Sequence, residues 1–166
     1  MDQQQHDVRR MLEDTPIFGG LKASTLAGLL SEAASIEVRE GAFFFREGEA
    51  ADAMFVLEQG RGAVLKRWQA QEYRIAELAC GDCFGEMALI DLQPRSASVM
   101  AVEDSRALRV TPADLYRVYE IDIEQFALIH MNIARELSRR LRWANERAFR
   151  HQLEVEASSA MAMFCT

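Results

Sequence analysis

A carboxylate and a guanidinium stand nine positions apart in this chain, at Glu86 and Arg95. The apolar run from Met87 to Leu92 between them is long enough for about two helical turns, whose first N–H groups would suit an anion. Arg95 adds a planar, always-charged fork that matches two phosphate oxygens, whereas Glu86 only accepts hydrogen bonds and suits a hydroxyl. This pair predicts a ligand that is a phosphate ester with a free hydroxyl nearby, such as a sugar phosphate or a nucleotide.

The residues around this pair resemble those of a known family. FGEMALID followed by PRSASV is similar to the phosphate-binding cassette of cyclic nucleotide-binding domains, the module of catabolite activator proteins, kinase regulatory subunits and nucleotide-gated channels. The resemblance implies that Glu86 holds the ribose 2′-hydroxyl of a cyclic nucleotide and that Arg95 holds its cyclic phosphate. It also implies that further contacts come from the backbone N–H groups of Gly85, Met87, Ala88 and Ala97, and from Ser96 to phosphate or base.

The resemblance covers about residues 12 to 145. Upstream of the cassette, the segment from Glu47 to Gly60 is similar to the family phrase EGE…D…F.L..G, and Glu40 stands where the family often has proline. A different interpretation of Glu86 and Arg95 is a structural ion pair between the two side chains. The surrounding cassette favours the ligand-binding interpretation.

Short strand-like runs recur at intervals of roughly ten residues from Ile36 to Val110, each bounded by Gly, Asp or Glu. This pattern favours an antiparallel β-roll or jelly-roll barrel of about eight strands. Helical segments are expected before it, and Thr111 with Pro112 marks a helix start after it. We therefore expect an α+β fold, mainly β with flanking helices. Its parts are residues 1–120 (β-roll and N-terminal helical lead-in), 121–156 (long C-terminal lid and dimerisation helix) and 157–166 (tail).

The segment from Ile121 to Glu156 contains no glycine or proline and turns helical. One apolar seam runs along it through Ile133, Leu137, Leu141, Ala144, Ala148 and Val155. A helix of about 30 residues extends ~45 Å, longer than a small barrel can cover, so another chain should bury part of the seam. We predict a homodimer through this helix.

Trp143 and Asn145 lie where relatives with a long C-terminal helix place residues over the base. Catabolite-activator-like proteins have a hydroxyl residue there, whereas Ala144 cannot hydrogen-bond a base. Trp143 can stack on a purine and Asn145 can read its edge. Alternatively, Trp143 packs on the barrel and Asn145 faces solvent. Both interpretations stay open, so the sequence does not choose between cAMP and cGMP.

The composition is ordinary for a globular chain of 166 residues, with 49% hydrophobic and 27% charged residues. A net charge of −7 opposes binding to nucleic acid or to an anionic membrane surface. The chain has no signal-peptide h-region, no run of about 18 apolar residues and an odd number of cysteines. We expect a cytoplasmic protein without a membrane span.

Cys80 and Cys83 form a C-x-x-C on a predicted turn. A zinc or redox site needs a second ligand pair or a low-pKa thiolate, and the third cysteine, Cys165, is far along the chain. We therefore expect no metal. None of the three histidines lies near a serine or cysteine in a nucleophile motif, and no phosphate-loop signature occurs. The prediction is a binding protein without catalytic residues.

Six arginines between Arg135 and Arg150 could contact DNA, although a solvated flank of the dimer helix is the simpler interpretation. Only sixteen residues follow Arg150, too few for a helix-turn-helix. We predict a stand-alone regulatory sensor that binds cAMP or cGMP and signals to a separate effector protein. The alternatives are a dimeric interaction module of the same fold that binds no nucleotide, and a DNA-binding transcriptional regulator.

Overall fold

The computed structural model describes the backbone of residues 3–91 and 93–164, and the side chains of 8–87, 89–91 and 93–156. The helical elements are α1 (Gln3–Asp14), η1 (Pro16–Phe18), α2 (Ala23–Glu32), η2 (Glu86–Leu89), α3 (Pro112–Ile121) and α4 (Ile123–Phe164). The strands are β1 (Ala34–Val38), β2 (Phe43–Phe45), β3 (Met54–Gln59), β4 (Gly62–Trp68), β5 (Gln71–Leu78), β6 (Cys83–Phe84), β7 (Ser98–Ala101) and β8 (Ser105–Val110).

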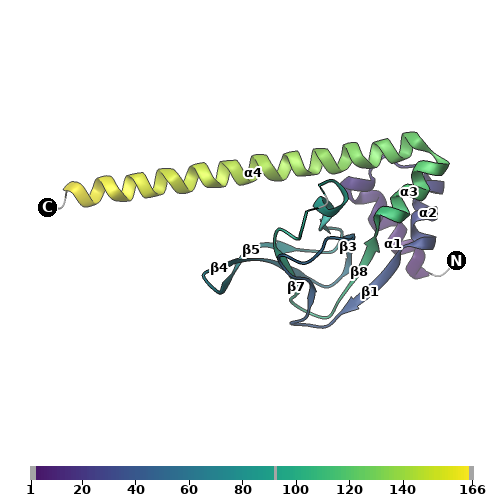
Figure 1. Ribbon diagram of the computed structural model, residues 1–166, viewed down its shortest axis with the longest axis horizontal. Helices are drawn as coiled ribbons and strands as arrows, with labels where there is room; N and C mark the ends of the chain where they lie inside the picture. The colour runs from purple at the N-terminus through teal and green to yellow at the C-terminus, as the bar shows by residue number, and fades with distance from the viewer. Residues whose placement is uncertain (1–2, 92, 165–166) are drawn as a thin grey trace.

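The strands pair antiparallel in two four-stranded sheets, ordered β1-β8-β3-β6 and β2-β7-β4-β5. Helices α1, α2 and α3 gather at one end of the sheets, and α4 runs along the molecule above them (Figure 1). The predicted α+β fold, mainly β with N-terminal helices and a long C-terminal helix, is confirmed.

Strand β3 joins two hydrophobic cores because side chains alternate across a strand and both of its faces are buried. Met54 and Val56 pack into a core with the helices, whereas Phe55 and Leu57 pack into a core between the two sheets. The Phe55 and Phe84 rings stack with their centroids 5.4 Å apart. Phe84 is the residue immediately before the cassette glycine, so the inter-sheet core fixes where the cassette begins.

The corner between α3 and α4 is formed by polar side chains that bond to the backbone. A capping box between Thr111 and Asp114 starts α3, and the Asp122 carboxylate accepts the N–H groups of Glu124 and Gln125 at the start of α4. The Lys22 ammonium donates to the other Asp122 oxygen at 2.7 Å, which ties this corner to the segment before α2. The long helix therefore begins from a fixed point.

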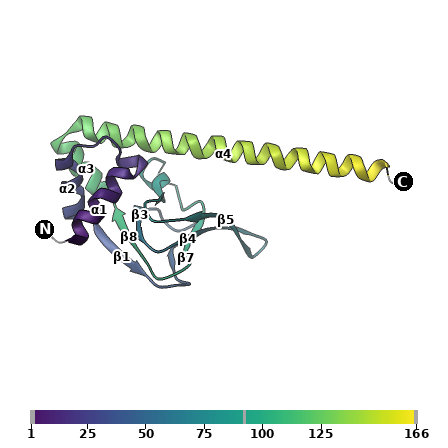
Figure 2. The same cartoon turned by 180° about the vertical axis from the view of Figure 1, so that it is seen from behind.

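Helix α4 begins at Ile123 and continues past residue 156 to Phe164, so residues 157–164, assigned to a tail from the sequence, extend the helix. Its 42 residues span about 63 Å. Ile129 and Ile133 near its start are fully buried in the helical core. From Leu141 on, the helix carries exposed apolar side chains at Leu141, Trp143, Phe149, Leu153 and Val155, and its C-terminal part extends beyond the sheets (Figures 1 and 2).

Candidate functional site

The cassette begins where β6 ends, at a glycine in a left-handed conformation. Gly85 has φ +73° and directly precedes η2, the short 3-10 helix Glu86–Leu89. A Cβ atom at Gly85 would lie 2.7 Å from Arg95 Nη1 and 3.2 Å from Phe45 Cε1. Both the backbone angle and the lack of space therefore require glycine here, and the chain can pass close against the arginine only for that reason.

Arg95 is buried, with 6% of its surface exposed, and its guanidinium is only partly satisfied. Nη1 donates to the Gly85 carbonyl at 3.2 Å, Nη2 donates to Asp52 Oδ1 at 3.4 Å, and the guanidinium lies 4.0 Å from the centre of the Phe45 ring. Nε is buried and has no hydrogen-bond partner among the described residues. An unsatisfied donor on a buried cation fits an anionic oxygen, so Arg95 can hold a phosphate.

The surroundings of Arg95 act on its ionisation in opposite directions. Burial lowers the pKa of the Arg95 guanidinium, while the carboxylates of Asp52 and Glu49 favour the charged form. Arginine nevertheless stays protonated in proteins. Asp52 also accepts a hydrogen bond from Arg109 Nη2 at 2.7 Å, so one carboxylate positions two arginines.

Glu86 is also buried, at 3% exposure, and its partner comes from α4. Arg140 Nη1 donates to Glu86 Oε1 at 2.8 Å, and Arg140 Nη2 donates to the Cys83 carbonyl at 2.7 Å. Glu136, one helical turn before Arg140, accepts from Arg140 Nε at 3.0 Å. The cassette carboxylate is therefore fastened to the long helix. Since Arg95 pairs with Asp52, the alternative of an ion pair between Glu86 and Arg95 is not what the structure shows.

A cavity of about 290 Å³ lies between the cassette and α4. Glu86, Arg95 and Ser96 supply polar groups in its lining, and Val64, Leu78 and Leu137 are among its apolar lining residues. A polar end beside an apolar wall suits a molecule with a charged, hydroxylated part and a flat apolar part. A nucleotide has this division, with its sugar phosphate and its base.

The structure brings together most of the residues predicted for the site. The cavity is lined by Gly85, Glu86, Met87, Arg95, Ser96 and Ala97. The backbone of Ala88 lies in η2, and its side chain lies outside the described residues. Trp143 and Asn145 do not line the cavity; both are exposed on α4, just beyond Arg140. The Arg147 guanidinium lies 5.4 Å from the Trp143 ring centre.

Three residues at the site, Arg140, Leu137 and Asp52, were not predicted as site residues from the sequence. Arg140 was counted only as one of six basic residues on the helix, although Leu137 and Arg140, three positions apart, share one helical face. Asp52 is the aspartate of the family phrase EGE…D…F.L..G, so the signal that could have identified it is its place in that phrase.

The C-x-x-C residues occupy different environments. Cys83 is buried, and burial raises the pKa of its thiol, whereas Cys80 is exposed and its Sγ lies 3.1 Å from the Glu58 carbonyl oxygen. Among the described side chains, those of residues 8–87, 89–91 and 93–156, no three His, Cys, Asp or Glu groups converge on a metal-binding geometry. In the same part of the chain, no helix is both long and apolar enough to cross a membrane.

Comparison with known proteins gives curated relatives that match more than half of this chain, two of which are described here. The cyclic AMP receptor protein of Thermus thermophilus is 32% identical over 135 residues, which are 81% of this chain and 61% of the relative. The cAMP-dependent protein kinase regulatory subunit of Aspergillus fumigatus is 33% identical over 99 residues, which are 60% of this chain and 24% of the relative. This chain thus spans about three fifths and one quarter of their lengths.

Solved structures show the same fold. The catabolite activator protein of Thermus thermophilus superposes with a TM-score of 0.71 at 30% identity, covering 80% of this chain and 61% of that protein. The EAL enzyme Bd1971 superposes with a TM-score of 0.55 at 36% identity, covering 65% of this chain and 98% of the other. The family profile described as cyclic nucleotide-binding domain matches residues 35–122. The chain belongs to the cyclic nucleotide-binding domain family.

Proposed function

We propose that this chain binds a cyclic nucleotide, cAMP or cGMP, in the cavity between the cassette and α4. The observation that carries the proposal is the pair of buried charged groups in one cavity wall, the incompletely paired Arg95 and the carboxylate of Glu86. Arg95 would bind the cyclic phosphate, and Glu86 would accept from the ribose 2′-hydroxyl. The backbone N–H groups of Gly85, Met87, Ala88 and Ala97, together with Ser96, would complete the phosphate site.

The bound nucleotide would act on α4 through Glu86. Arg140 uses this carboxylate to fasten α4 to the cassette, and a ribose hydroxyl would share or take over the same acceptor. The contacts between Arg140 and the cassette would then differ in strength between the two states. A ligand shifts a conformational equilibrium only through such a difference in interaction energy. The position of α4 is therefore the proposed output of a sensor, and we propose no catalytic reaction for the chain.

The base would lie against the apolar wall of the cavity. Trp143 and Asn145 are proposed to contact it after α4 has moved, because both follow Arg140 closely on the same helix. Both curated relatives have cAMP in their names, so cAMP is the first ligand to test. A non-binding interaction module is the second candidate function, and the exposed apolar side chains of α4 favour it if nucleotides fail.

The part of α4 from Leu141 onward is proposed to pair with α4 of a second copy. Leu141 is 62% exposed and Val155 51%, and these residues lie on the predicted seam with Ala144 and Ala148. A helix that projects from a domain with an apolar seam gains stability when a partner helix covers the seam. The free thiols of Cys80 and Cys83 fit a reducing compartment, so we propose a cytoplasmic location. An effector protein would receive the signal, and the net charge of −7 argues against DNA.

Thermal unfolding of the purified chain with cAMP, cGMP, 2′-deoxy-cAMP or AMP tests the proposal. A ligand that binds only the folded state, at a hundred times its dissociation constant, adds about 2.7 kcal/mol of stability, or roughly 5–10 °C in Tm. One cyclic nucleotide should give this shift and AMP should not. In Glu86→Gln, the difference between cAMP and 2′-deoxy-cAMP should shrink. No shift with any cyclic nucleotide, from protein shown by mass spectrometry to be ligand-free, would favour the interaction module.

A further inference from the structure

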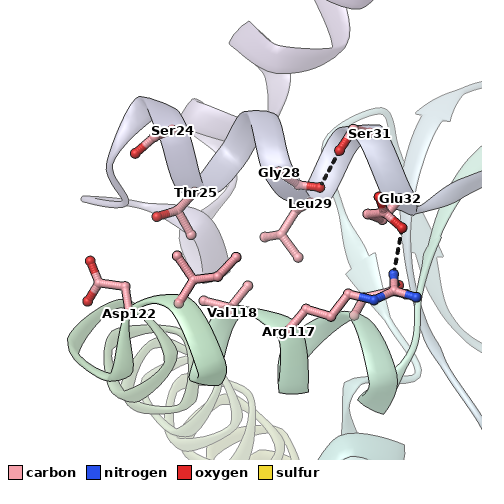
Figure 3. A pocket seen from close by; sticks show the side chains of 11 residues that line it. Ser24, Thr25, Gly28, Leu29, Ser31, Glu32, Arg117, Val118 and Asp122 are labelled. Carbon is pink, nitrogen blue, oxygen red and sulfur yellow. Dashed lines mark hydrogen bonds and ion pairs between the residues drawn. The ribbon is translucent and has the colours of Figure 1, made fainter.

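A groove of about 320 Å³ separates α2 from α3, and none of the cassette residues lines it. In Figure 3, Leu29 from α2 and Val118 from α3 point into the gap between the two helices. Gly28 lies beside Leu29, and a Cβ atom added there would meet nothing within 4 Å. The groove is therefore open over Gly28 and has an apolar floor.

The charged groups along the groove are fixed by one another. Arg117 Nη1 donates to Glu32 Oε2 at 2.8 Å and to Asp114 Oδ1 at 3.3 Å, bridging α3 to α2 (Figure 3). The Ser31 hydroxyl donates to the Gly28 carbonyl at 2.8 Å. In contrast, Ile121 is 85% exposed at the end of α3. An apolar floor beside a prearranged polar rim suits an apolar side chain carried by a polypeptide more than a small polar ligand.

The charge around the groove is mainly negative. Carboxylates of Glu32, Asp114 and Asp122 line it. Two cations, Lys22 and Arg117, pair with these three carboxylates, which leaves one negative charge in excess. An excess of negative charge attracts a basic partner and repels an acidic one.

We propose that this groove binds a basic amphipathic helix of a partner protein. An apolar side chain of the partner would sit over Gly28, between Leu29 and Val118, and its Lys or Arg side chains would face the carboxylates. The groove reaches Asp122, the residue that caps α4, so the partner would contact the base of the long helix directly. The proposal goes beyond nucleotide binding and does not depend on it.

A synthetic helical peptide with leucines at i, i+3, i+4 and i+7 and lysines elsewhere is the probe, with binding followed by fluorescence anisotropy. The decisive variant is Gly28→Leu, which fills the groove without changing the charge of the protein. Its matched control is Ala27→Leu, since Ala27 is exposed on the same helix and does not line the groove. Leucine is a stronger helix former than glycine, so the Tm of Gly28→Leu should be no lower than that of wild type.

The peptide should bind wild type and Ala27→Leu with equal affinity. Its affinity for Gly28→Leu should be lower by a factor of at least about ten. A second peptide with glutamates in place of the lysines should not bind. Equal binding to Gly28→Leu and wild type would overturn the proposal, because the peptide would then occupy another acidic surface. Equal binding of the two peptides, or no saturable binding by the lysine peptide, would overturn it as well.

Discussion

Replacing Gly85 with alanine should disable the nucleotide site through Arg95. Alanine at this position would have to adopt the unfavourable backbone angle φ +73°, and its Cβ atom would lie 2.7 Å from Arg95 Nη1. The left-handed conformation costs an L-residue about 1–2 kcal/mol. If the guanidinium shifts away, its hydrogen bond to the Gly85 carbonyl is also lost, which is worth about 1.5–3 kcal/mol for a charged donor. Together the two costs come to about 2.5–5 kcal/mol.

Gly41→Ala is the control that separates these two effects. Gly41 has φ +77°, and an added Cβ atom there would meet nothing within 4 Å, so only the backbone cost of about 1–2 kcal/mol applies. Each kcal/mol corresponds to about 2–4 °C in Tm for a chain of this size. Both variants are compared by thermal unfolding and by cAMP titration. If Gly85→Ala binds cAMP as tightly as Gly41→Ala, the guanidinium does not hold the phosphate from its observed position.

Three further predictions concern contacts around the site. Arg140→Leu should lower stability by about 1–2 kcal/mol, because it leaves the buried Glu86 carboxylate without its partner, whereas Arg139→Leu removes only an exposed pair and should cost less than about 0.5 kcal/mol. Urea unfolding measures both, and equal losses would contradict the assigned role of Arg140. Thr111→Ala should cost about 1 kcal/mol through loss of the α3 cap, and an unchanged unfolding midpoint would show that the capping box contributes nothing. For Glu47, the hydrogen bond from the Lys66 ammonium holds the carboxyl pKa below its ordinary 4.5, so its stabilisation is present above that pH and is lost as pH falls through the lower folded value. The stability difference between wild type and Glu47→Gln should therefore shrink below about pH 4.5, and a difference that grows in acid would refute this sign.

The cassette could be predicted from the sequence because its geometry is local. Gly85, Glu86 and Arg95 lie within eleven positions, so one short segment holds all three and its resemblance to the family cassette identifies them together. Met54, Phe55, Val56 and Leu57 form one apolar run because both faces of β3 are buried. The sequence shows the run, but it does not show that its residues point in turn into two different cores.

The contribution of α4 to the site could not be predicted in the same way. Arg140 reaches Glu86 across 54 positions, and which helical face meets the cassette is set by the packing of Ile129 and Ile133 into the helical core. Periodicity identified an apolar seam but not where the sheets stop covering it. The two interpretations of Trp143 therefore stayed open in the sequence, and in this structure its side chain is exposed and lies outside the cavity lining. A helix rises 1.5 Å per residue, so residues one turn apart lie about 5.4 Å apart along the axis. That distance decides whether a side chain of α4 lies over the cavity or beyond it.

Isothermal titration of cAMP into wild type, Arg95→Leu and Arg109→Leu tests the proposed function most directly. Arg95 and Arg109 share Asp52 as acceptor, but only Arg95 lines the cavity. Wild type and Arg109→Leu should each bind one cAMP per chain, and Arg95→Leu should lose at least about 2 kcal/mol of binding free energy, or roughly thirtyfold in affinity. Unchanged affinity in Arg95→Leu, or equal losses in the two variants, would contradict it.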